Sequence, residues 1–140
     1  MKSGIYRKGE ISLEQIIDEL KKREDIDKVG AILTFTGIVR GTSKDGKRVR
    51  GLKIDAYPEL ANESIEKIRN DIKKREGIIE VIIIHFMGDF DISEDLVYVI
   101  IACSHREEGF KALKDAVERY KKEIAVWKRE DFKDGSSKWV

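Results

Sequence analysis

The sequence predicts an α+β fold in which helices pack on one side of a mixed or antiparallel sheet. Apolar residues recur at helical spacing in three segments, and β-rich apolar runs alternate with these segments. No internal repeat or Gly/Ser linker interrupts the chain, and 140 residues with 41% hydrophobic side chains suffice to close one core. We therefore expect a single domain over residues 1–140.

The first predicted helix begins at a capping box formed by Ser12 and Gln15. The apolar residues that follow it at helical spacing are Leu13, Ile16, Ile17 and Leu20. Residues 29–39 and 49–57 are rich in β-branched side chains and predict two strands. The loop 41–48 between them contains Asp45-Gly46, which favours a tight turn, so the loop is either a hairpin tip or a mobile flap.

The second half of the chain continues this alternation. Pro58 can start a helix that runs to Arg75. Two central strands are expected at 79–87 and 96–103, joined by the acidic connection 88–95. Ser104 and Glu107 suggest a capping box for a third helix, with an apolar stripe of Phe110, Leu113, Val117, Tyr120 and Ile124. The tail from Ala125 to Val140 predicts a short strand, a turn and a docked end.

Composition bounds the cellular setting and the partners. The 28 basic and 27 acidic side chains leave a net charge of +1, so no overall field attracts nucleic acid or a membrane surface. The longest apolar runs are far below the roughly 20 residues that cross a bilayer. A single cysteine excludes an intrachain disulfide and suits the reducing cytoplasm. Many charges and few amides are typical of proteins from hot environments.

The sharpest local feature is Ser104-His105-Arg106, where a strand leads into a capped helix. The free amides at a helix start can bind an anion such as phosphate. Alternatively, Glu107 and Glu108 satisfy this helix end, and His105 and Arg106 are only solvated. The residues alone leave both interpretations open.

Two lysines are candidates for chemistry. Lys121 falls within about 20° of Phe110 around the third helix, which predicts partial desolvation. Lys128 follows Trp127 and is either an exposed lysine that covers the ring or part of a cationic cluster. Convergence of both lysines with Arg40 and Arg106 would lower a lysine pKa and yield a nucleophile or base.

Cys103 and His85 are expected to be structural. Both lie inside apolar strand-like runs, and no second histidine or cysteine has the spacing of a metal ligand. We therefore predict no metal and no cofactor.

Four motifs occur in the same order as in the large, catalytic subunit of molybdopterin synthase, and the chain resembles this family from about Gly30 to the end. They are Gly37-Ile38-Val39-Arg40-Gly41, Ala56-Tyr57-Pro58-Glu59-Leu60-Ala61, Ser104-His105-Arg106 and Val126-Trp127-Lys128-Arg129-Glu130. Asp134-Gly135 and Trp139-Val140 also fit.

The resemblance implies an α/β hammerhead fold and a sulfurtransferase. It implies a homodimer with a small ubiquitin-like sulfur carrier on each outer side, which makes a heterotetramer. The carrier's Gly-Gly tail, ending as a thiocarboxylate, would enter a pocket here. Two sulfur transfers to cyclic pyranopterin monophosphate would then form the dithiolene of molybdopterin.

By the same resemblance, Lys121 and Lys128 match the family's essential lysines, while Arg40, His105 and Arg106 match its substrate-anion pocket. The pocket is expected to form across the dimer, with Arg40 and the loop 41–48 reaching toward the neighbouring subunit. Two alternatives are a module that binds a phosphorylated ligand or RNA, and a scaffold that binds the carrier without turnover. Interleaved acidic residues disfavour nucleic acid.

Overall fold

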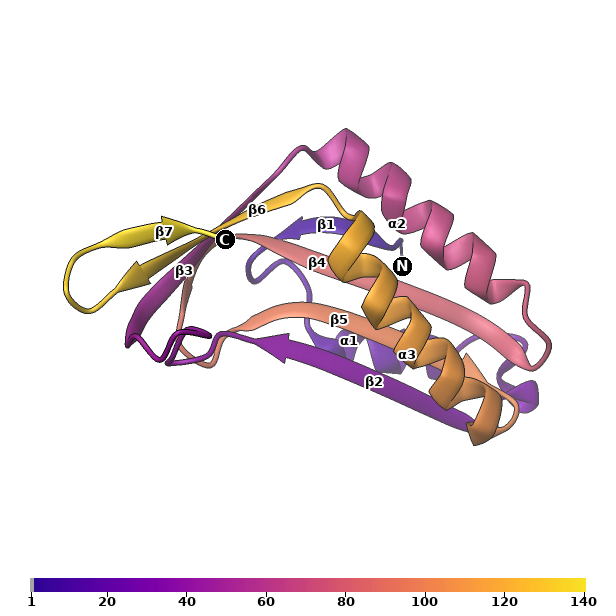
Figure 1. The fold of residues 1–140 in the computed structure, drawn as a ribbon. Helices are drawn as coiled ribbons and strands as arrows, with labels where there is room; N and C mark the ends of the chain where they lie inside the picture. The colour runs from indigo at the N-terminus through magenta and orange to yellow at the C-terminus, as the bar shows by residue number, and fades with distance from the viewer. Residues whose placement is uncertain (1) are drawn as a thin grey trace.

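The computed structural model describes residues 2–140 and places their strands in one sheet of seven (Figure 1). The strand order is β2-β5-β4-β3-β6-β7, and β1 pairs with β4 in parallel. The elements are β1 (Gly4–Arg7), α1 (Leu13–Lys21), η1 (Ile26–Lys28), β2 (Ala31–Ile38), β3 (Val49–Ala56), α2 (Pro58–Lys73), β4 (Ile78–Asp91), β5 (Asp95–Cys103), α3 (Arg106–Glu123), β6 (Val126–Phe132) and β7 (Ser137–Trp139). The predicted α+β class with a mixed sheet is confirmed.

The central strand β4 is longer than the sequence suggested. It pairs with β5 through its first half, and its second half continues through Gly88 to Asp91 alongside β3. The acidic connection predicted at 88–95 is therefore wrong for its first four residues. Gly88 has a φ of 132°, a conformation that favours glycine, and lets the strand change direction without ending.

Helices cover both faces of the sheet, so the expected one-sided arrangement is wrong. In Figure 1, α2 and α3 lie on the near face and α1 lies behind. Val81 and Ile83 of β4 belong to the core beneath α2 and α3, whereas Ile82 and Ile84 pack with Ile16 of α1. Strands that are apolar on both faces must be covered on both faces.

Helix α3 is rotated relative to the predicted stripe. Its buried residues are Gly109, Ala112, Ala116 and Tyr120, while Phe110 is 59% exposed. A Cβ on Gly109 would lie 2.4 Å from the Cys103 sulfur, so small residues let the helix approach β5 closely. The predicted capping box is also absent, because the Ser104 hydroxyl donates to the Lys28 carbonyl and His105 occupies the N-cap without a side-chain bond.

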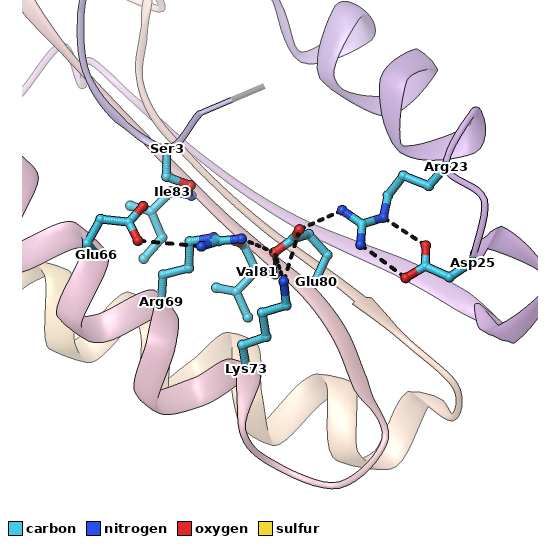
Figure 2. Close-up of polar contacts among 9 residues, drawn as sticks. All are labelled: Ser3, Arg23, Asp25, Glu66, Arg69, Lys73, Glu80, Val81 and Ile83. Carbon is cyan, nitrogen blue, oxygen red and sulfur yellow. Dashed lines mark hydrogen bonds and ion pairs between the residues drawn. The ribbon is translucent and has the colours of Figure 1, made fainter.

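A buried carboxylate joins helices from the two sides of the sheet (Figure 2). Glu80 of β4 is 6% exposed and lies 2.6 Å from the guanidinium of Arg23, after α1, and 2.7 Å from that of Arg69 in α2. The Lys73 amine is 3.4 Å away. Burial raises the pKa of Glu80, but the Val81 amide and these cations outweigh it, so its pKa lies below the usual range.

None of the helices in the described range is long and apolar enough to span a membrane.

Glu80→Gln should lower the free energy of unfolding by about 2–3 kcal/mol, because it removes a buried charge from partly exposed cations. The wild type should lose this contribution as the pH falls through the depressed pKa of Glu80, since a lowered folded-state pKa stabilises only the ionised form. Urea unfolding followed by circular dichroism measures both effects. Asp115→Asn is the matched control, because the Arg75–Asp115 pair is exposed and should change stability by less than about 1 kcal/mol. Equal losses in the two variants would contradict the special role of Glu80.

Candidate functional site

A hollow of about 650 Å³ lies where the end of β2, the last turns of α3, and β6 meet. Its lining includes Arg40, His85, Tyr120, Lys121, Lys128 and Val140. Apolar side chains such as Leu52, Leu96 and Ile124 form much of the remaining wall. Three of the five candidate site residues, Arg40, Lys121 and Lys128, therefore converge in one place.

Local structure explains how these three cations reach the hollow. Arg40 directly follows Val39, which is buried and is held by hydrogen bonds with Ser93 and Glu94 of the β4–β5 turn. Lys121 lies in the last turns of α3, with its amine 6.0 Å from the centre of the Phe35 ring. Lys128 lies in β6 opposite Ile54 of the neighbouring strand β3.

The loop 41–48 borders the hollow and is fastened to the β6–β7 hairpin. An antiparallel bridge between Thr42 and Arg48 closes the tight turn, as Asp45-Gly46 predicted. The loop is not the tip of a β2–β3 hairpin, because β5 and β4 separate those strands. The Lys47 amine lies 4.5 Å from the Phe132 ring centre and 3.4 Å from the Asp134 carboxylate.

The electrostatics of the hollow single out Lys128. Burial, and then the positive charge of Lys121, lower the pKa of the Lys128 amine. Lys128 is half-buried whereas Lys121 is exposed. The partial desolvation predicted for Lys121 is therefore wrong, and Lys128 is the desolvated lysine. Among residues 2–140, Arg40, Lys121 and Lys128 form no ion pair. Basic side chains in the lining (Arg40, Lys44, Lys121, Lys128 and Lys138) outnumber the acidic ones (Asp45 and Glu130), so the hollow is suited to an anionic ligand.

Two further groups of the hollow were not predicted as site residues. His85 is 1% exposed, and its burial lowers the pKa of the imidazole to about 4. Burial also raises the pKa of Tyr120 to about 12. Both are therefore neutral at physiological pH. The apolar surroundings of His85 in the sequence indicated a buried strand residue, which it is, but gave no sign that β4 carries it to the hollow.

His105 and Arg106 do not line the hollow. They lie at the opposite end of α3 from Lys121, and 15 helical steps separate Arg106 from Lys121 by about 22 Å. One chain therefore brings together only part of the predicted set. Within the part of the chain that the structure describes, no group of three or more His, Cys, Asp or Glu side chains is placed to hold a metal ion.

Comparison with known proteins decides the family. The family model described as MoaE protein matches residues 6–123. The chain is 34% identical to the molybdopterin synthase catalytic subunit of Halalkalibacterium halodurans over 93% of its own length and 80% of that protein. It is 33% identical to that of Pyrococcus abyssi over 95% and 92% of the two chains. The chain belongs to the MoaE family.

Solved structures agree with this assignment. The molybdopterin synthase structure from Staphylococcus aureus superimposes with a TM-score of 0.86 and 32% identity, covering 100% of this chain and 98% of that one. The same fold occurs in a complex of subunits 1 and 2 of the molybdopterin-converting factor from Helicobacter pylori, at a TM-score of 0.75 and 20% identity over 98% of this chain and 87% of that one. The predicted MoaE-type fold and enzyme family are confirmed, and the ligand- or RNA-binding alternative is not favoured.

Lys121→Gln should raise the pKa of Lys128, because it removes the neighbouring positive charge that disfavours the ammonium form. The pKa should stay below the usual lysine range, since burial remains. Heteronuclear NMR titration of the lysine side chains measures the change. Lys122→Gln, one residue further along α3, is the control and should leave Lys128 unaffected. An unchanged Lys128 pKa in Lys121→Gln would contradict the coupling.

Proposed function

We propose that the hollow is the sulfur-transfer site of this MoaE protein. The observation that supports this proposal is that Lys121, Lys128 and Arg40 converge in one partly apolar hollow. None of the three forms an ion pair among the described residues. The sulfur donor would be the thiocarboxylated tail of a small ubiquitin-like carrier. The acceptor would be cyclic pyranopterin monophosphate, and two transfers would give the dithiolene of molybdopterin.

The cations suit separate parts of this reaction. The guanidinium of Arg40 can hold a phosphate in a bidentate way. Because its pKa is lowered, Lys128 more readily supplies a neutral amine that acts as nucleophile or base when a thioester-like intermediate forms or breaks down. Lys121 holds positive charge beside it, where the thiocarboxylate or phosphate would lie.

The carrier would bring the sulfur, so no cysteine of this chain is needed as a sulfur donor. Cys103 is fully buried against α3, and burial followed by the charge of Glu108 raises the pKa of its thiol. A buried thiol with a raised pKa is a poor nucleophile. This environment supports a packing role for Cys103.

A second copy of the chain would supply His105 and Arg106. These residues are about 22 Å from Lys121 along α3, too far to share a ligand with it in one chain. In a homodimer, the start of one α3 could face the hollow of the other chain and add its free amides to the phosphate site. One carrier per hollow then makes a heterotetramer.

The cytoplasm is the proposed location. The lone cysteine is a free, buried thiol, which agrees with a reducing compartment, and the proposed reaction needs a thiocarboxylated carrier that would be made in the same compartment.

Lys121→Ala and Lys128→Ala should each abolish dithiolene formation while carrier binding persists. The measurement is mass spectrometry of the product after mixing each variant with thiocarboxylated carrier and cyclic pyranopterin monophosphate. Lys122→Ala keeps the helix and changes a neighbouring exposed lysine, so it should retain wild-type turnover. Normal turnover by either site variant would rule out the role assigned to that lysine.

At a pterin concentration too low to saturate Arg106→Ala, a mixture of Arg106→Ala and Lys128→Ala chains should be more active than either variant alone. If both residues serve one site from different chains, half of the randomly formed dimers carry one intact site, which gives about one quarter of wild-type activity. Arg106→Ala alone should chiefly weaken pterin binding. Product formation in the mixture that does not exceed the mean of the two parent variants would show that each chain builds its site by itself.

A further inference from the structure

His85 is the buried polar group of the hollow that the sulfur-transfer proposal does not use. Its Nδ1 lies 3.0 Å from the carbonyl oxygen of Phe86. A carbonyl only accepts, so Nδ1 must carry the proton of the neutral ring. The other nitrogen, Nε2, is then an acceptor with a free lone pair.

That lone pair opens onto the hollow. Among residues 2–140, Nε2 has no hydrogen-bond partner. Every fully enclosed side-chain nitrogen or oxygen of these residues does have a partner, so Nε2 is not fully enclosed. Nε2 must therefore reach the cavity that His85 lines. An imidazole buried in a strand with one nitrogen unused needs an explanation, because Phe or Leu would fill the same space without desolvating a polar atom.

The surroundings hold His85 in this orientation. His85 and Gly37 are both partners of Val97, so the three residues form a row across β4, β5 and β2. The Tyr120 ring contacts the imidazole edge-on, with 5.9 Å between ring centres. A Cβ on Gly37 would approach Val97 to 2.7 Å, so glycine keeps this row closely packed. These contacts define the orientation of the imidazole.

Lys128 is the group that can use this acceptor. Its amine is half-buried, lines the same hollow and has no hydrogen-bond or ion-pair partner among the described residues, and its charge acts on His85. The four-carbon stem lets the amine reach neighbouring acceptors. The other titratable groups that line the hollow are Arg40, Lys44, Asp45, Tyr120, Lys121, Glu130 and Lys138.

Building on the proposed sulfur-transfer site, we propose that His85 is a positioning residue for Lys128. Its Nε2 accepts a hydrogen bond from the Lys128 amine, so that the amine's lone pair points away from His85 and into the hollow. An amine fixed in this way reacts in one direction, and misplacement of a reacting group is costly to the rate. His85 itself stays neutral and does not take the proton.

The first test leaves His85 in place and needs no turnover. The ¹⁵N resonance of His85 Nε2 is measured in the wild type, in Lys128→Met and in Lys122→Met. The proposal expects the resonance to move in Lys128→Met, where the donor is lost, and to stay constant in Lys122→Met. The same position in all three proteins would overturn the contact.

The second test uses enzyme kinetics. His85→Phe keeps a ring but removes the acceptor, and should lower kcat about 10- to 100-fold while KM changes less than about twofold. His85→Gln retains an acceptor and should restore most of the rate. Ile83→Val, a buried change two residues earlier on the same face of β4, controls for packing loss. A kcat for His85→Phe equal to that of Ile83→Val would reduce His85 to a packing residue.

The two tests separate this inference from the function on which it rests. If the wild type transfers no sulfur but the Nε2 resonance responds to Lys128→Met, the contact stands and the proposed function fails. If the wild type is active and the resonance is insensitive to Lys128→Met, the function stands and the positioning role fails.

Discussion

The burial of β4 and β5 on both faces is the constraint on which the rest of the structure depends. Val81, Ile83, Val99 and Ile101 face α2 and α3, while Ile82, Ile84 and Ile100 face the side of α1. Water must be excluded from both faces at once, so helices from distant parts of the chain have to meet across this pair of strands. Glu80 reinforces the arrangement by binding cations from α1's end and from α2.

The position of the hollow depends on the second half of β4, which extends beyond this core. After Gly88 the same strand pairs with β3, which in turn pairs with β6 and thereby places Lys128. The end of β2 and the last turns of α3 supply Arg40 and Lys121 from the other side. Secondary structure thus brings like charges together, and burial together with their repulsion lowers the pKa of the Lys128 amine.

Local sequence signals predicted those features that depend on neighbouring residues. The capping box at Ser12, the start of α2 at Pro58 and the central strands follow from short-range patterns. The rotation of α3 could not be foreseen, because its buried face is made of small residues such as Gly109 and Ala112, and Gly109 approaches Cys103 closely. Likewise, β4 passes through its acidic end because pairing with β3 is a long-range interaction. Sequence patterns indicated Lys121 and Lys128 as candidates, but only the fold shows that Lys128 is the desolvated one.

Helix α3 carries residues of the proposed site at both of its ends, Arg106 at the first residue and Lys121 in the last turns. In the proposed dimer, each α3 would therefore contribute to two catalytic centres, one through its amino end and one through its carboxyl end. The stiffness of a continuous helix makes their spacing a fixed property of the assembly. Any tilt of one chain against the other would then change the geometry of both centres together, because each α3 helix connects the two centres rigidly.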